Sequence, residues 1–375
     1  MHDPVYLDHA ATTPLRAEAR RALLEALDGA WGNPSSVHRW GRESRALLDD
    51  ARARLARVIG AAPGEVVFTR AGTEADNLAI LGRARALPGA PVACSAVEHR
   101  AVLAAAHAAG APVRVLPVDA EGVVRLDAVD GALAEEPSVV SVMWANNETG
   151  VVQPVDEIAR RCVAAGVAFH SDAVQALGKL PVRVDRVPAS LVSFSAHKVG
   201  GPKGTGALFV RRGTHLSPLS HGGGQERGLR PGTEDVAGAL AFAAAAEAAE
   251  AERDEAMPRI RALRDRLEAG LRERIPELRV NGAGAERLAG VSNLSVPGAD
   301  PEMLLVALDL EGIAASSGSA CSSGAVEPSH VLLAMGLPAA VAGPSVRFSL
   351  GWRTTAADIE RVLAVFPRVV ERVRI

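Results

Sequence analysis

The chain has 375 residues and a formal net charge of −3, from 41 basic and 44 acidic side chains. This length exceeds the ~100–150 residues of a typical single domain, so we expect one large domain and one smaller domain. The interspersed charges exclude a basic nucleic-acid-binding surface, and no apolar run approaches the ~20 residues that span a bilayer. The N-terminal residues lack the pattern of a signal peptide, so we expect a cytoplasmic protein without nucleic-acid or membrane partners.

Two helical patterns come first along the chain, one starting at Thr13-Pro14 and one ending near Gly60. Between about 65 and 211, short apolar runs then alternate with alanine-rich helical patterns. This alternation predicts an α/β fold with a mostly parallel sheet of seven strands that is covered on both faces. The last connection is short and glycine-rich, so the final strand is expected to be antiparallel. The predicted strands cover 65–69, 91–96, 112–118, 138–145, 166–172, 189–195 and 206–212.

A long helical stretch follows over about 234–274, with an expected interruption at Pro258. We place the domain boundary there, with a large domain over 1–255 and a small α/β domain over 256–375. Roughly the first 14 residues are expected to pack on the small domain.

Lysine is rare in this chain: only Lys179, Lys198 and Lys203 are lysines, and the other basic residues are arginines. Arginine cannot replace lysine where a neutral amine must attack a carbonyl group, because its guanidinium group stays protonated. The clustered lysines therefore favour a residue that binds a carbonyl cofactor covalently.

The three cysteines, Cys94, Cys162 and Cys321, have no paired spacing, which argues against a disulfide framework and a zinc site, and we expect no metal. Cys94 and Cys162 lie in apolar patterns and are expected in the core. Cys321 lies among small polar residues and glycines in SSGSACSSG (316–324), where an exposed thiol is expected.

Polar residues follow several of the predicted strands at their carboxyl ends, where open α/β sheets bind ligands. These groups suit pyridoxal phosphate, which needs an amine, an acid beside its ring nitrogen and donors for its phosphate. Lys198 supplies the amine, Asp172 the acid, and the helix start at Gly72-Thr73 offers backbone N–H groups to the phosphate. The candidate residues after the strands are Gly72, which offers its backbone N–H, and the polar residues Thr73, His99, Asn146, Asn147, Asp172, Gln175, Ser195, His197 and Lys198.

Longer motifs run almost from end to end, and with them the chain closely resembles the cysteine desulfurases of the NifS/IscS type. These belong to the class V aminotransferase group of fold-type I pyridoxal-phosphate enzymes. The motifs are YLDHAATTP (6–14), GNPSSVH (32–38), TEADNLAI (73–80), EHRAVL (98–103), NNETGVVQP (146–154), DAVQALGK (172–179), SFSAHKVGGPKGTGAL (193–208), HGGGQERGLRPGT (221–233), SSGSACSSGAVEPSHVL (316–332) and RFSLG (347–351).

The resemblance implies a conversion of L-cysteine to L-alanine, with sulfur carried as a persulfide on Cys321 to an acceptor protein. That acceptor could be an iron–sulfur scaffold or a thiolation enzyme. Lys198 would hold the cofactor and move the α-proton, and His99 would stack on the cofactor ring and assist proton transfer. The remaining implied roles are Asp172 at the ring nitrogen, Gln175 at the ring hydroxyl oxygen, Thr73, Ser195 and His197 at the phosphate, Thr233 at the phosphate of the neighbouring subunit in a homodimer, and Asn147 and Arg347 at the substrate carboxylate.

Other functions stay open at this point. A class V aminotransferase or a selenocysteine lyase would use the same cofactor site, and an aminotransferase would not need Cys321. A serine hydrolase is excluded, because no G-x-S-x-G motif occurs. The chain departs from the family pattern at Arg70-Ala71, where Ser-Gly is usual, and this puts the geometry of the phosphate loop in doubt.

Overall fold

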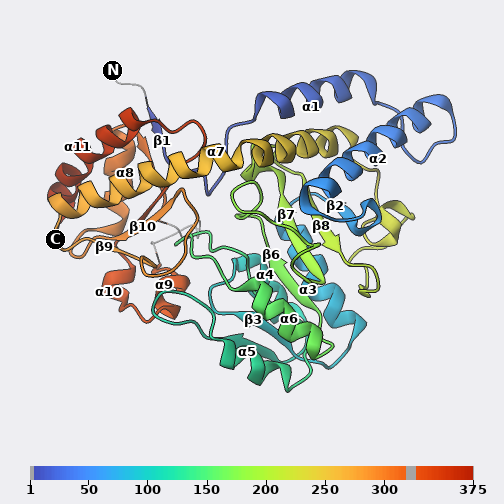
Figure 1. The fold of residues 1–375 in the computed structure, drawn as a ribbon, viewed down its shortest axis with the longest axis horizontal. Helices are drawn as coiled ribbons and strands as arrows, with labels where there is room; N and C mark the ends of the chain where they lie inside the picture. The colour runs from blue at the N-terminus through green and yellow to red at the C-terminus, as the bar shows by residue number, and fades with distance from the viewer. Residues whose placement is uncertain (1–3, 318–326, 375) are drawn as a thin grey trace.

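The computed structural model describes residues 4–317 and 327–374, so Cys321 lies outside the described residues. Its largest sheet has seven strands in the order β2-β8-β7-β6-β5-β3-β4 (Figure 1). The strands are β2 (Val66–Thr69), β3 (Val92–Ser95), β4 (Val113–Leu116), β5 (Val139–Ser141), β6 (Phe169–Asp172), β7 (Leu191–Ser195) and β8 (Gly206–Val210).

The pairing of these strands is parallel from β4 through β3, β5 and β6 to β7. Only β8 runs the other way, antiparallel to both β7 and β2. The connection between β7 and β8 is too short for a crossover helix, and a parallel return would need one. The predicted sheet, mostly parallel with a reversed last strand, is confirmed.

Both faces of this sheet are covered by helices. Neighbouring residues of a strand point to opposite faces, and in β2 the residues on both faces are buried. Val66 and Phe68 of β2 belong to a core shared with α2 and α7, whereas Val67 packs with residues of α3 on the other face. The helices before α7 are α1 (Ala17–Gly29), α2 (Arg39–Ile59), α3 (Gly72–Ala86), α4 (Arg100–Ala108), α5 (Leu126–Leu133) and α6 (Val155–Ala164), and the 3₁₀ turns are η1 (Pro63–Glu65), η2 (Ala196–Lys198) and η3 (Gln225–Gly228).

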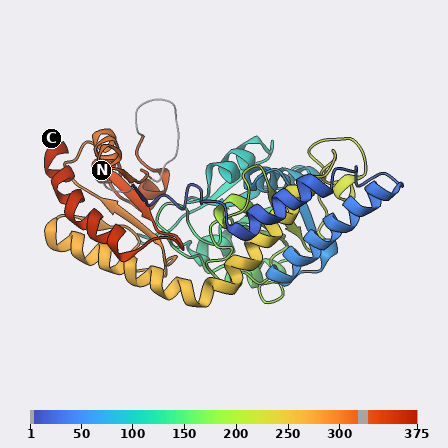
Figure 2. The same ribbon diagram turned by 90° about the horizontal axis from the view of Figure 1, so that it is seen from above.

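Helix α7 (Val236–Arg274) continues through Pro258, so the expected interruption is wrong. A proline inside a helix costs about 3 kcal/mol. Both halves of α7 offset this cost by packing: residues up to Ala249 are buried in the larger core, and Ile260, Leu267 and Leu271 in a second core. Figure 2 shows this helix running from the small-domain end of the molecule into the large domain. Because α7 changes core near its middle, we propose the boundary at 255/256 and use the names large and small domain.

The second core lies in the small domain between short sheets and helices. A three-stranded sheet has the order β12-β10-β9, and the N-terminal strand β1 pairs in parallel with β11. This pairing fixes the N-terminal segment to the small domain. The strands are β1 (Val5–Tyr6), β9 (Arg279–Val280), β10 (Val291–Ser295), β11 (Ile313–Ala314) and β12 (Ser345–Ser349), and the helices are α8 (Pro301–Leu310), α9 (His330–Ala334), α10 (Ala339–Ala342) and α11 (Ala356–Val373). In the described ranges, no helix has the length and apolar character needed to cross a membrane.

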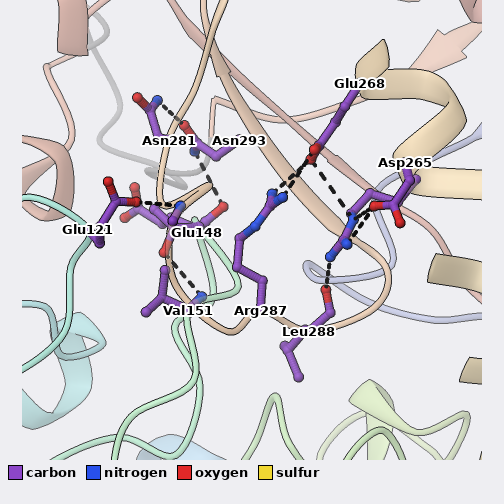
Figure 3. Close-up of polar contacts among 12 residues, drawn as sticks. Glu121, Glu148, Val151, Asp265, Glu268, Asn281, Arg287, Leu288 and Asn293 are labelled. Atoms are coloured by element: carbon purple, nitrogen blue, oxygen red, sulfur yellow. Dashed lines mark hydrogen bonds and ion pairs between the residues drawn. The ribbon is translucent and has the colours of Figure 1, made fainter. Parts of the chain in front are cut away.

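The two domains are joined by a buried polar contact, drawn in Figure 3. Arg287 donates from both ends of its guanidinium group to the Glu268 carboxylate of α7, at 2.7 and 3.0 Å. The backbone beside Arg287 bonds the loop after β5, with the Leu288 N–H donating to the Gly150 carbonyl oxygen at 2.8 Å. Asn293 of β10 donates to the carbonyl oxygen of Glu148 in the same loop. This contact therefore couples α7 to a loop that reaches the site described below.

Replacement of Arg287 by methionine leaves the buried Glu268 carboxylate with only the Arg264 guanidinium group, 4.0 Å away, as an ion-pair partner. We expect the free energy of unfolding to fall by about 3–5 kcal/mol, as is usual when one partner of a buried pair is removed. The control is Arg266→Met on α7, the helix that also carries Glu268. Arg266 and Glu360 form an exposed ion pair, which is worth about 1 kcal/mol or less. Denaturant titration measures both values, and equal losses in the two variants would contradict this role for Arg287.

Candidate active site

A cavity of about 310 Å³ lies where the parallel strands end. It is lined by nearly all of the site residues predicted from the sequence: Gly72, Thr73, His99, Asn147, Asp172, Gln175, Ser195, His197, Lys198 and Arg347. Thr233 is exposed and does not line this cavity. Cys321 lies outside the described residues. The predicted groups are thus brought to one place by the ends of five strands and by β12 of the small domain.

Lys198 sits at the end of η2, directly after β7. Its Nζ atom donates to the carbonyl oxygens of Ala10 and Ala11, at 2.6 and 2.7 Å. Burial, and next the charge of Arg347, lower the pKa of the Lys198 amine to about 8. About a tenth of this amine is therefore neutral at pH 7, far more than for a lysine in water, and the neutral form is the one that attacks a carbonyl group.

Asp172 is the last residue of β6 and is almost completely buried. One carboxylate oxygen accepts the Val174 N–H at 2.8 Å. Burial raises the pKa of Asp172, while His99, this backbone hydrogen bond and Lys198 lower it. A cation placed in the cavity beside Asp172 would stabilise its charged form further.

His99 caps the start of α4, where its Nδ1 atom accepts the Ala101 N–H at 3.1 Å. A ring nitrogen that accepts a hydrogen bond carries no proton, so the neutral ring has its proton on Nε2. Burial lowers the pKa of His99, with Asp172 opposing this effect. The cap therefore fixes the tautomer of a histidine that lines the cavity.

The N-terminus of α3 forms a narrow cradle at the other end of the cavity. A Cβ atom at Gly72 would lie 2.7 Å from Val174 Cγ2 and 3.4 Å from Ser195 Cβ, so only glycine fits without displacement of its neighbours. Backbone N–H groups at a helix start, together with Thr73, Ser195 and His197, are suited to an anion. His197 is positioned by a 3.1 Å contact from its Nδ1 atom to Thr12 Oγ1.

Arg70, the departure from the family pattern, points away from this cradle. Its guanidinium group pairs with Asp235 at 2.8 Å, and its backbone N–H donates to the Glu74 carboxylate. It does not line the cavity, whereas Ala71, Gly72 and Thr73 do. The arginine therefore leaves the cradle open.

Arg347 enters the cavity from β12 and already has two protein partners. One guanidinium nitrogen donates to the Asn147 carbonyl oxygen at 2.9 Å, and the other to the Asp8 carboxylate at 2.7 Å. The Nε atom of Arg347 is buried without a hydrogen-bond partner among the described residues. A carboxylate that binds this fork must therefore exchange with Asp8.

Four charged or titratable residues in the cavity wall escaped the sequence reasoning: Asp76, Arg100, Glu148 and His330. Asp76 lies one helical turn after Thr73, and Arg100 and Glu148 directly follow predicted site residues, so their spacing could have identified them. His330 follows the Cys321 segment, and its Nε2 atom lies 3.0 Å from the Glu98 carbonyl oxygen. Only the fold shows that His330 lies at the cavity.

Cys94 and Cys162 are completely buried in the cores, as expected. Burial raises the pKa of each thiol to about 12, so neither forms a reactive thiolate near neutral pH. Among residues 4–317 and 327–374, no group of histidine, cysteine and acidic side chains could hold a metal ion.

Comparison with known proteins gives consistent results. The Aminotransferase class-V family matches residues 5–362. A "Cysteine desulfurase IscS" from Dictyoglomus turgidum is 44% identical, over 100% of this chain and 96% of the relative. The solved NifS-like protein from Rickettsia africae is 30% identical with a TM-score of 0.90, covering 98% of this chain and 99% of that one. SspA, solved in complex with cysteine, is 30% identical with a TM-score of 0.78, covering 92% and 98%.

These matches confirm both the resemblance drawn from the motifs and the expected fold class. They extend over both domains, and the residues that line the cavity lie within the matched range. The chain belongs to the class V aminotransferase family, together with the cysteine desulfurases of the NifS/IscS type.

Proposed function

We propose that this chain is a pyridoxal-phosphate-dependent cysteine desulfurase, which converts L-cysteine to L-alanine and passes the sulfur through Cys321. The observation that carries this proposal is that one cavity is lined both by Lys198, a buried lysine with a lowered pKa, and by the buried carboxylate of Asp172. Relatives named cysteine desulfurase match the chain over its full length, which supports the same reaction here. The complex of SspA with cysteine supports the same substrate for this chain.

The chemistry of the cavity wall fits pyridoxal phosphate. Lys198 would hold it covalently, Asp172 would pair with its ring nitrogen, and Gln175 would donate to its ring hydroxyl oxygen. Gly72, Thr73, Ser195 and His197 form the cradle that would take its phosphate, where a side chain larger than hydrogen at position 72 has no room. When bound, this cofactor withdraws electrons from the substrate carbon.

The chain's own residues then bind the substrate and move its protons. Arg347 would bind the substrate carboxylate in place of Asp8, beside Asn147. Lys198 would remove the α-proton of the substrate, with His99 assisting through its neutral ring.

Cys321 supplies the nucleophile in this proposal. As a thiolate it would attack the sulfur of the substrate, so that an S–S bond forms as the carbon–sulfur bond breaks. The electron pair of the broken bond stays with the substrate's β-carbon, which takes a proton. The α-carbon regains the proton that Lys198 removed, and alanine leaves. The persulfide on Cys321 is then passed to an acceptor protein, such as an iron–sulfur scaffold or a thiolation enzyme. We infer a cytoplasmic location from this role.

A homodimer is part of the proposal. Apolar side chains are exposed around the turn between α1 and α2, with Trp31 at 66%, Val37 at 89% and Trp40 at 50% exposure. The two tryptophan rings contact each other with centroids 5.4 Å apart and their planes tilted by 35°. An apolar cluster of this kind on a surface is typical of a protein interface. Thr233, exposed and outside the cavity of its own subunit, would then contact the phosphate in the neighbouring one.

The function is tested by measuring alanine and sulfide from L-cysteine and a thiol reductant. We expect both products from the native protein. Lys198→Ala should lower alanine formation by about a hundredfold or more, as is usual for loss of a positioned proton-transfer group. Cys321→Ser should lose sulfide release while it keeps the bound cofactor. Sulfide at the native rate from Cys321→Ser, or no alanine from a cofactor-loaded native protein, would refute the proposal.

The rate of cofactor loading should depend on pH. Burial and the charge of Arg347 lower the pKa of Lys198 to about 8. The fraction of Lys198 in the reactive neutral form therefore rises through this pH and reaches its maximum above it. Stopped-flow absorbance with cofactor-free protein should therefore show a loading rate that rises through about pH 8 and then levels off. Arg347→Met removes one lowering charge and should move this midpoint to higher pH. A native midpoint near the ordinary value of 10.5 would contradict the burial argument.

A further inference from the structure

Lys179 is the one lysine near the site to which the proposed reaction assigns no role. It ends the DAVQALGK motif, in a chain that uses arginine almost everywhere else. Two successive turns after β6 return the chain so that Lys179 lies beside Gln175: the Leu177 N–H donates to the Ala173 carbonyl oxygen, and the Lys179 N–H to that of Ala176. The motif thus places a second amine behind the cavity wall.

A chain of hydrogen bonds connects Lys179 to Lys198. Lys179 Nζ donates to Gln175 Oε1 at 3.1 Å, and Gln175 Nε2 donates to the Ala10 carbonyl oxygen at 2.8 Å. The same carbonyl oxygen accepts Lys198 Nζ at 2.6 Å. Among the described residues, Gln175 Oε1 is the one hydrogen-bond acceptor of the Lys179 amine.

This chain determines which way the Gln175 carboxamide faces. A backbone carbonyl only accepts and a protonated lysine amine only donates, so both partners demand the same orientation. The oxygen of Gln175 must face Lys179, and its NH₂ group faces the site cavity. One of the two N–H bonds reaches Ala10, which leaves the second for a ligand in the cavity.

The apolar surroundings of Lys179 leave its amine and the Gln175 amide few other hydrogen-bond partners. Lys179 and Lys198 both line a second cavity of about 40 Å³, whose walls are mainly apolar and include Leu288, Leu350 and Trp352. Burial, and next the charge of Lys198, lower the pKa of Lys179 to about 7. In a weakly hydrated space the amide oxygen has few other donors available. The charged or titratable groups around the two amines are Asp8, His9, Arg16, His99, Asp172, His197, Glu252 and Arg347.

We propose that Lys179 is a positioning residue, which holds Gln175 with its amide N–H directed at the ring hydroxyl oxygen of the cofactor. This inference rests on the proposed pyridoxal-phosphate site. The amide N–H stabilises a negative charge on that oxygen. Loss of the lysine leaves the amide held by the Ala10 carbonyl oxygen alone, so its second N–H is directed less firmly at the ring oxygen and the bound cofactor takes up a proton more readily.

The test is the absorbance of the bound cofactor as a function of pH, without substrate. Lys179→Met should move the midpoint of the spectral change to higher pH by about one unit, because a hydrogen bond to a charged group is comparable to one pKa unit. Lys179→Arg keeps a donor and should stay near the native midpoint. Lys203→Met removes the exposed third lysine and serves as the matched control, with no shift expected.

A double-mutant cycle separates positioning from a general structural effect. Gln175→Leu alone should raise the midpoint, and adding Lys179→Met to it should cause no further shift. Additive shifts would overturn the inference, as would a native midpoint in Lys179→Met. The melting temperature of the cofactor-free form checks folding, and Lys179→Ala replaces Lys179→Met if the latter does not fold. If the native protein shows no cofactor spectrum at all, the proposed function itself fails and this inference with it.

Discussion

The parallel order of β3, β5, β6 and β7 brings His99, Asn147, Asp172 and Lys198 together at one edge of the sheet. Each of these residues lies within six positions of the end of its strand, so the strand pairing fixes their places relative to one another. Helix α3 starts at the same edge and adds the anion cradle at Gly72. A shift in the pairing of any one strand would remove a group from the cavity, and the rest of the site depends on this arrangement.

The small domain and the N-terminal segment complete the cavity from outside the sheet. Arg347 comes from β12, and the Ala10 and Ala11 carbonyl oxygens bind Lys198 from the segment that follows β1. Burial lowers the pKa of Lys198 to about 8 and that of Lys179 to about 7. Both amines can therefore lose their proton near neutral pH, which a lysine in water does not. The buried pair of Arg287 and Glu268 fixes the small-domain segment that bonds the loop after β5, through Leu288 to Gly150 and Asn293 to Glu148.

The fold and most of the cavity wall could be predicted because their signals are local. A strand is a short apolar run, and a residue just after it lies at the carboxyl edge. The contact of Arg347 with Asp8 joins positions 339 residues apart, and no local pattern announces it. The same holds for His330 and for the carbonyl oxygens at Lys198, because backbone atoms carry no sequence signal. The continuation of α7 through Pro258 was missed for a related reason, since packing against two cores outweighs the local preference of proline.

The most direct test of the sulfur transfer is mass spectrometry of the protein after incubation with L-cysteine carrying heavy sulfur, followed by alkylation and digestion. We expect one added heavy sulfur atom on the peptide that contains Cys321. We expect none on the peptides of Cys94 and Cys162, whose buried thiols stay protonated. Heavy sulfur on either buried cysteine, or alanine formed without any labelled Cys321, would contradict a transfer through Cys321.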